Sequence, residues 1–280
     1  SIFSELNNVT NVSMYDEYAG MLGITKEELC GQLSEDIEVL ATKMHLTKEQ
    51  TLDKLTENYD GYHFSAYSPD VFNPYSLFNC FAQGKLGSYW FASGTPTYLI
   101  NMMRKYHVLP TGITRVEADE SEFDAPTEDM TTMMPLLYQS GYLTIKDYNR
   151  DYNYYTLDIP NKEVKIGLTK ALIPSYVTGN TLATTNTARR IAQALDKQDM
   201  DGALHLLQDF LGTVPYCNVT NHEGHYQQML FIIFSLLTDY LVDVEVHTPK
   251  GRVDVVLLTG TDLYIIELKL DKSAQAAMQQ

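Results

Sequence analysis

Residues 251–270 read GRVDVVLLTGTDLYIIELKL, and this stretch decides the fold predicted for the C-terminal part of the chain. Two runs of mostly β-branched and aliphatic residues, 253–258 and 263–270, flank the polar segment 259–262. Such runs on either side of a short loop that contains glycine are typical of a β-hairpin. We therefore predict two antiparallel strands joined by a turn at Gly260.

The charged residues of this hairpin are few and their spacing is specific. Side chains alternate along a strand, so Glu267 and Lys269 face one way while their apolar neighbours face the other. Pairing across the hairpin brings Asp254 beside them. Charges among apolar neighbours are costly to desolvate unless they pair or bind a metal. The pattern therefore indicates either a metal site or a structural ion pair on a partly exposed strand.

Asp254 and Glu267 are hard oxygen ligands, which favour Mg²⁺ or Mn²⁺. A cation held there would polarise a phosphodiester, and Lys269 would orient the attacking water and stabilise charge on the phosphoryl oxygens. The triplet E-x-K is weak evidence alone, because Glu163-Val164-Lys165 repeats it after Asp158. There the intervening Pro160 and Asn161 exclude a hairpin that would put both carboxylates on one face.

Composition limits the function classes. The chain has 280 residues, 44% of them hydrophobic, which is enough for about two domains. Its formal net charge of −16 argues against broad affinity for phosphate backbones, so any contact with nucleic acid must be local or assisted by metal. Cys30, Cys80 and Cys217 are dispersed, which predicts neither disulfides nor a cysteine zinc site and suits a reducing cytoplasm.

No apolar run is long enough to predict a membrane span. The start at Ser1 lacks an initiator Met and the features of a signal peptide, so we expect this sequence to be part of a longer protein.

The first part of the chain is predicted to be mostly helical. Thr25 with Glu28 and Thr47 with Gln50 have capping-box spacing, so we predict two helices over residues 25–58. The pair Asn73-Pro74 suits an N-cap and a first helical position for a helix through Phe81. A further short helix is expected to end near Arg104.

In the middle of the chain, the spacing of apolar residues changes from that of helices to that of strands. Acidic residues between 117 and 129 predict an exposed connection, followed by a helix at 133–139. The runs 142–145 and 154–157 flank the turn-forming residues 149–151 and predict a hairpin, with a helix from about Asn161. A helix on each side of a two-stranded ribbon resembles a winged-helix layout, and further helices are predicted at 187–197 and 200–211.

After Pro215 the pattern is helix (223–237), strand (242–247), strand (253–258), strand (263–270) and a helix opening at Ser273. The fold class is thus α+β, with a mostly helical N-terminal region before an α/β core. The predicted domains are a helical region at 1–126, a winged-helix-like and helical connector at 127–215, and a nuclease-like domain at 216–280.

The C-terminal residues resemble the PD-(D/E)XK nuclease superfamily, whose restriction-endonuclease-like core is a helix, a β-hairpin and a third strand. Asp254, Glu267 and Lys269 match its motif, although Val253 stands where the motif has Pro. Glu223 matches the acidic residue that many members carry on the preceding helix. Gln280 matches a Gln that often assists the site. The resemblance implies Mg²⁺ or Mn²⁺ and a nucleic-acid substrate, with DNA expected.

The chain also resembles a bacterial family that joins an AAA-ATPase-like region to such a nuclease domain. The resemblance rests on short segments along most of the chain, namely 1–4 with 7–8, 59–64, 73–74, 89–91 with 93–96, and 138–143. In that family a P-loop lies upstream, and G-x-x-x-x-G-K-[ST] is absent from this sequence. The resemblance therefore implies that ATP acts only through a region outside this sequence.

Other candidates remain open at this stage. Asp60 and His63 would form a catalytic or metal pair, or belong to a tight aromatic turn. His222 and His225 have helical spacing for zinc, or are solvent-facing residues at a helix start beside Glu223. A non-catalytic alternative also exists: a nucleic-acid or protein interaction module with a degenerate nuclease core. Residues 127–139 contain no Lys or Arg, which favours a structural or ATPase-lid role for the winged-helix segment.

Overall fold

The computed structural model describes residues 10–93, 97–125, 130–176, 181–213, 222–235, 241–248, 251–259 and 262–267. The chain divides into two compact units. Unit 1 comprises Ser1–Val108 and Gly112–Gly167, and unit 2 comprises Leu109–Thr111 and Leu168–Gln280. The predicted boundaries at residues 126 and 215 remain predictions.

Unit 1 begins with short helices, of which α1 to α5 contribute to one hydrophobic core. These are the 3-10 helix η1 (Ala19–Leu22) and helices α1 (Lys26–Gln32), α2 (Ser34–Met44), α3 (Lys48–Tyr59), α4 (Pro74–Gln83), α5 (Tyr89–Ser93) and α6 (Thr97–Lys105). Both predicted capping boxes are present, and Asn73 caps α4 with Pro74 in its first turn. The prediction of two helices over residues 25–58 was wrong, because Leu33 leaves the helical conformation and separates α1 from α2.

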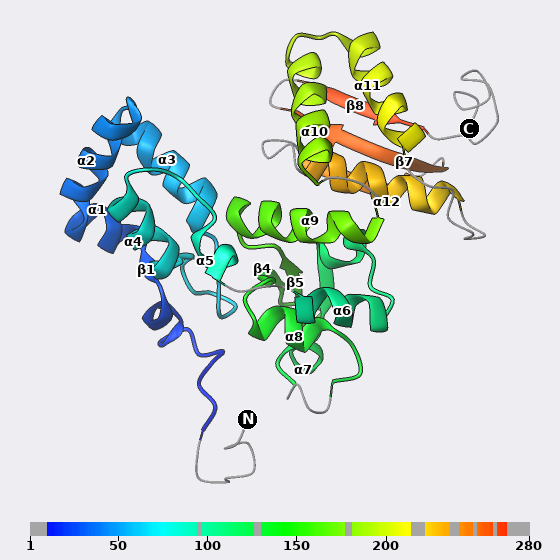
Figure 1. Ribbon diagram of the computed structural model, residues 1–280. Helices are drawn as coiled ribbons and strands as arrows, with labels where there is room; N and C mark the ends of the chain where they lie inside the picture. Colours follow the sequence, from blue (N-terminus) through cyan, green and yellow to red (C-terminus); the bar gives the residue numbers. More distant parts are fainter. Residues whose placement is uncertain are drawn as a thin grey trace. The chain divides into compact units, whose positions relative to one another are not determined.

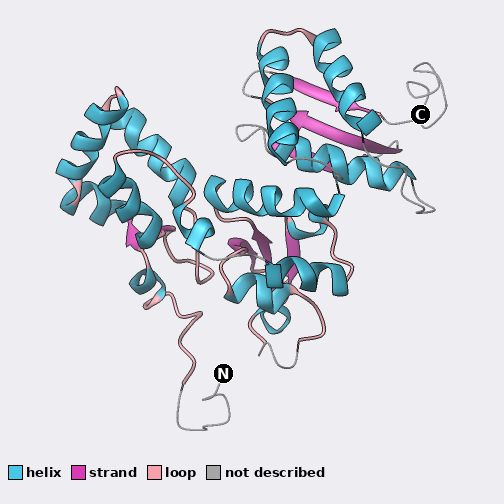
Figure 2. Ribbon diagram, viewed as in Figure 1, coloured by secondary structure: helices cyan, strands magenta, loops and turns pink. Residues whose placement is uncertain are grey.

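Two small sheets complete unit 1. Strand β1 (Ile24–Thr25) pairs with β2 (Val71–Phe72), and β3 (Val116–Ala118), β5 (Tyr154–Asp158) and β4 (Thr144–Asn149) form an antiparallel sheet in that order (Figure 2). Helices α7 (Glu120–Phe123) and α8 (Met134–Gln139) lie in this unit, and α9 (Lys162–Tyr176) begins in it and ends in unit 2. The 3-10 helix η2 (Pro110–Ile113) begins in unit 2 and ends in unit 1. The predicted hairpin and the helix after it are thus confirmed.

The prediction of an exposed connection at 117–129 was wrong for its first part. Strand β3 and helix α7 lie there, and Phe123 is fully buried. The ring of Phe123 packs edge-on against Tyr138 at 4.7 Å and Tyr155 at 5.4 Å between ring centroids. The acidic residues mark only the outer side of this segment, so composition concealed its buried side.

Unit 2 combines helices with a three-stranded antiparallel sheet. Its elements are α10 (Thr181–Asp196), α11 (Met200–Thr213), α12 (His222–Ser235) and strands β6 (Leu241–Thr248), β7 (Gly251–Leu258) and β8 (Leu263–Ile266). Strand β7 is central, and α12 packs against β6 and β7 (Figure 1). The predicted order of helices and strands is confirmed, while the predicted helix at Ser273 lies outside the described residues.

One continuous core holds unit 2 together. Apolar residues of α10, α11 and α12 pack with Val255 and Leu257 of β7, and Tyr264 and Ile266 of β8 lie against them. The sheet therefore has one face toward the helices, which leaves the alternate residues of β7 and β8 on the other face. This division fixes the face on which the predicted site residues lie.

Candidate functional site

Asp254 and Glu267 lie at matching positions of the β7·β8 ladder. The two strands pair Val255 with Ile266, Val256 with Ile265, Leu257 with Tyr264 and Leu258 with Leu263. Asp254 comes directly before the first of these pairs, and Glu267 comes directly after it. The same register, continued by one residue, sets them opposite each other. Directly opposite residues of an antiparallel pair share one face of the sheet.

This face is the one turned away from the helices. Val255 and Leu257 are buried in the core, so Asp254, between Val253 and Val255, belongs to the opposite face. Its side chain is nevertheless only 3% exposed. The Oε2 atom of Glu267 is also buried. A buried acidic residue and one buried carboxylate oxygen thus lie at the same end of the sheet, where a bound cation would offset the repulsion between the two acidic groups.

The donor chemistry fits a hard divalent cation, because carboxylate oxygens are the ligands that Mg²⁺ and Mn²⁺ prefer. Among the described side chains, however, no group of three or more His, Cys, Asp or Glu residues is arranged to hold a metal ion. Asp254 and Glu267 therefore do not by themselves provide a full set of protein ligands.

The other predicted site residues are described less fully. Glu223 lies in the first turn of α12, the helix that packs against β6 and β7, but its side chain is outside the described part of the structure. The same holds for the side chains of His222 and His225, the alternative zinc pair. Lys269 and Gln280 lie outside the described residues altogether.

Strand β6 contributes a position that the sequence predictions missed. It pairs Val244 with Val255 and Val246 with Val253 in one constant register, so Glu245 lies opposite Asp254 in the ladder. The sequence does contain a pattern that places Glu245 on a polar strand face. Valine alternates there with polar residues, namely Val242, Val244 and Val246 with Asp243, Glu245 and His247. Without the register, nothing in this alternation indicates which strand lies beside Asp254.

The second E-x-K triplet has a different role. Residues 163–165 lie in α9, and Glu163 is 2% exposed. Its Oε1 atom accepts hydrogen bonds from the backbone N–H groups of Trp90 at 2.7 Å and Phe91 at 3.4 Å, in the short helix α5. Burial raises the pKa of Glu163, and the hydrogen bonds from Ser76 and the α5 backbone oppose that rise. Glu163 thus serves as a structural cap of α5.

In the candidate pair of the aromatic turn, Asp60 and His63, the histidine pairs with Asp70. The Nδ1 atom of His63 lies 3.0 Å from Oδ1 of Asp70, and the hydrogen bond from His63 lowers the pKa of Asp70. Asp60 is buried, which raises its pKa. The nearby Lys146 donates hydrogen bonds from Nζ to the carbonyl oxygens of Gly61 and Pro160. These contacts favour the interpretation of this segment as a packed turn.

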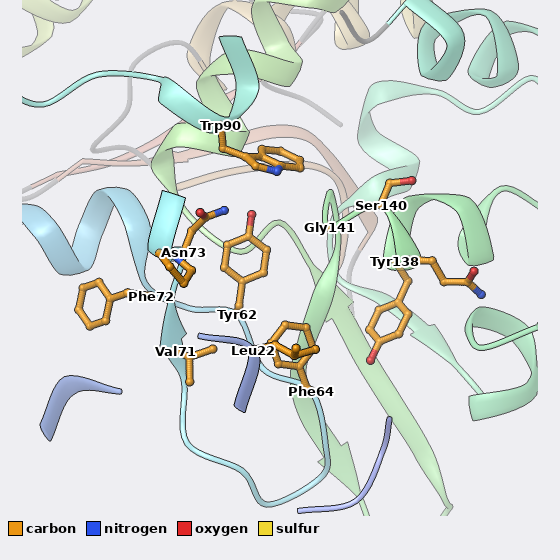
Figure 3. A pocket seen from close by; sticks show the side chains of 12 residues that line it. Leu22, Tyr62, Phe64, Val71, Phe72, Asn73, Trp90, Tyr138, Ser140 and Gly141 are labelled. Atoms are coloured by element: carbon orange, nitrogen blue, oxygen red, sulfur yellow. The ribbon is translucent and has the colours of Figure 1, made fainter. Parts of the chain in front are cut away.

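A cleft in unit 1 gathers several of the segments that the sequence analysis singled out. Two cavities, of about 600 and 250 Å³, share the lining residues Leu22, Tyr62, Phe64, Tyr138, Gln139 and Gly141. Figure 3 shows the smaller one, with Trp90 and Asn73 beside Tyr62 and with Gly141 between Tyr62 and Tyr138. Its walls come from residues far apart in sequence, so no local pattern predicted it.

Comparison with known proteins agrees with the geometry of the C-terminal sheet. Residues 221–280 match the PD-(D/E)XK nuclease superfamily, so this part of the chain carries a domain of that superfamily. Such nucleases are generally dependent on divalent metal ions, and their substrates are nucleic acids.

The whole chain is 27% identical, over 289 aligned residues, to a protein described as "Uncharacterized protein in vnfD 5'region" from Azotobacter chroococcum mcd 1. The alignment covers 100% of this chain and 53% of that protein, so the chain spans about half the length of this relative. No solved structure was found to match the chain. In the described residues, no helix is both long enough and apolar enough to cross a membrane.

Proposed function

We propose that the protein is a nuclease that hydrolyses phosphodiester bonds of DNA with the help of Mg²⁺ or Mn²⁺ bound at Asp254 and Glu267. The observation that carries this proposal is the β7·β8 register, which continues from the pair Val255 and Ile266 to the two acidic residues. The superfamily match at residues 221–280 supports it independently.

Each proposed site residue has a role that follows from its position in the sheet or in a neighbouring helix. Asp254 and Glu267 hold the cation, which when bound polarises a phosphodiester and lowers the pKa of a coordinated water. Lys269 follows Glu267 by two residues, on the same strand face in the alternation of the sequence. Its ammonium group orients the attacking water and stabilises negative charge on the phosphoryl oxygens. Glu223, on α12, and Gln280 complete the site.

The net charge of −16 shapes how a substrate is held. A strongly acidic chain repels a phosphate backbone at long range, so a bound cation and a local contact supply the attraction.

We further propose that an ATPase region outside this sequence is coupled to the nuclease and that the protein acts in the cytoplasm. The resemblance to the AAA-ATPase-like family supports the coupling, and the dispersed cysteines support a reducing compartment.

Cleavage assays on the full-length protein test the proposal. Single-stranded, nicked and branched DNA are each incubated with Mg²⁺ or Mn²⁺, with and without EDTA. Asp254→Asn and Lys269→Met should abolish cleavage that depends on metal. Lys165→Met is the matched control, because Lys165 belongs to the helical E-x-K triplet of α9, and it should leave cleavage unchanged.

Unchanged cleavage by Asp254→Asn would overturn the assignment of the site. Absence of metal-dependent cleavage from the wild-type protein on all of these DNA substrates would overturn the proposed activity on DNA and favour the alternative of a non-catalytic interaction module.

A further inference from the structure

Three acidic positions form one row across the C-terminal sheet. Residue 245 of β6 lies opposite Asp254 of β7, because the pairs on either side of it, Val244 with Val255 and Val246 with Val253, have the same register. Glu267 continues the row on the side of β8. Asp254 therefore occupies the middle of the row, with an acidic residue on each neighbouring strand.

The residue types along this row would allow the three carboxylates to contact one cation. Adjacent strands lie about 4.8 Å apart, so Glu245 and Glu267 are roughly 10 Å from each other across the sheet. The middle position is Asp, with a short side chain, and both outer positions are Glu, which is longer by one methylene group. A Glu side chain on an outer strand is in general long enough to bring its carboxylate over the central strand.

Three neighbouring carboxylates are unfavourable without a counter-charge. Like charges directly opposite each other on adjacent strands destabilise a sheet, and the low exposure of Asp254, 3%, reduces screening by water. Residues 221–280, which include this sheet, independently match a superfamily whose nucleases generally depend on divalent metal ions. We propose that Glu245 is a third carboxylate ligand of the divalent cation, beside Asp254 and Glu267. This inference rests on the proposed nuclease function.

The competing explanation is an ordinary solvated strand face. Asp243, Glu245 and His247 alternate with valines in β6, a pattern that a strand with one polar face also produces. The two explanations differ at Asp243. Its partner in the ladder is Val256, and Val256 pairs in turn with Ile265, so the row of Asp243 contains no second acidic residue. Asp243 thus provides a control on the same strand.

Mn²⁺ binding to the full-length protein, followed by the electron paramagnetic resonance signal of free Mn²⁺ at 0.15 M salt, tests the inference without reference to activity. Wild-type protein should bind Mn²⁺, and Asp254→Asn should abolish binding. Glu245→Gln should weaken affinity roughly ten-fold or more, as losses around metal sites commonly do. Asp243→Asn should stay within about two-fold of wild type, because salt screens a charge that makes no contact with the ion.

A second variant separates ligation from long-range charge. Glu245→Asp keeps the charge but shortens the side chain, so it should weaken Mn²⁺ binding if the carboxylate contacts the ion. Circular dichroism of each variant establishes that it is folded. Should Glu245→Gln fail to fold, Glu245→Asp alone decides the question.

The outcomes separate the two proposals. If wild-type protein binds no Mn²⁺, the proposed function fails. If Asp254→Asn loses binding while Glu245→Gln and Glu245→Asp bind as wild type does, only the role of Glu245 is overturned. Equal weakening by Asp243→Asn and Glu245→Gln also overturns it, since a general electrostatic effect would then explain both.

Discussion

Glu163 in α9 accepts a 2.7 Å hydrogen bond from the backbone N–H of Trp90, which lies 73 residues earlier in the chain. This contact ties the start of α5 to α9 within unit 1. It also explains why a triplet that imitates a nuclease motif belongs to the structural framework. The acidic side chain is used as an acceptor for a helix start, where exposed N–H groups need partners.

Replacement of Glu163 should therefore depend on whether an acceptor is kept. Glu163→Ala removes an acceptor of the part-buried N–H groups of Trp90 and Phe91 and should lower the free energy of unfolding by about 1–3 kcal/mol. Glu163→Gln keeps a carbonyl oxygen and removes a buried charge, so its stability at pH 7 should equal or exceed that of wild type. Urea unfolding of both variants measures the difference. Equal destabilisation by Ala and Gln would show that the charge itself is required.

The pH dependence of the free energy of unfolding should include a contribution from Glu163. Burial raises the pKa of Glu163 in the folded protein, so the folded state binds this proton more tightly than the unfolded state. The stability that this proton contributes is fully present below the pKa of the unfolded chain. It is lost as the pH rises through the raised pKa of the folded state.

Wild-type stability relative to Glu163→Gln should therefore fall as the pH rises through this window. Urea unfolding of the two proteins at a series of pH values tests this. Their difference isolates Glu163 from Asp60, Asp124 and Asp158, whose raised pKa values affect both proteins alike. A difference that is constant with pH would contradict the prediction.

Gly61 and Gly141 both have backbone conformations that are unfavourable for other residues, so their substitutions can be compared. Both have positive φ angles, 89° and 75°, which L residues adopt at a cost of about 1–2 kcal/mol. A Cβ on Gly141 would lie 3.6 Å from Cε1 of Tyr62, an ordinary contact, whereas one on Gly61 would clash with the carbonyl oxygen of Pro160.

Gly141→Ala should therefore cost about 1–2 kcal/mol, and Gly61→Ala should cost about 1–3 kcal/mol more because of the added steric strain. Thermal unfolding followed by the fluorescence of Trp90, the single tryptophan of the chain, measures both. Equal losses would show that the backbone near Pro160 moves aside without cost.

Gln228 of α12 fixes the segment Leu109–Thr111 to unit 2. Its Oε1 atom accepts a hydrogen bond from the backbone N–H of Thr111 at 3.3 Å, and its Nε2 atom donates one to the Thr111 hydroxyl at 2.9 Å. Gln228→Met keeps the size but removes both partners, so it should lower the free energy of unfolding by about 1–3 kcal/mol. Thr111→Ala removes one bond and should cost less. The opposite ranking in urea unfolding would argue against a role for the amide.

Metal binding should stabilise the folded protein. A cation that binds only the native state adds about 2.7 kcal/mol at one hundred times its Kd, so Mn²⁺ should raise Tm and EDTA should reverse the rise. Asp254→Asn should remove the effect. Differential scanning calorimetry with and without Mn²⁺ measures it. A rise of the same size in Asp254→Asn would place the stabilising cation elsewhere.

Local sequence was sufficient where a short segment determines its own structure. The capping boxes at Thr25 and Thr47 and the proline after Asn73 begin helices through contacts within one turn. The hairpin of β7 and β8 likewise follows from two apolar runs around a turn, which sets Asp254 against Glu267. The resemblance of these residues to the superfamily motif also predicted a nuclease-like domain at residues 216–280, and the superfamily match covers residues 221–280.

Only the tertiary structure decided which segments meet. The burial of Phe123 depends on Tyr138 and Tyr155, and the cleft around Tyr62 is built from distant segments. Glu245 shows the same limit, because its alternation with valines indicates a strand face but not the neighbouring strand. Contacts of this kind arise from packing over long separations in sequence, whereas the Asp254 and Glu267 pair arises from a turn of a few residues.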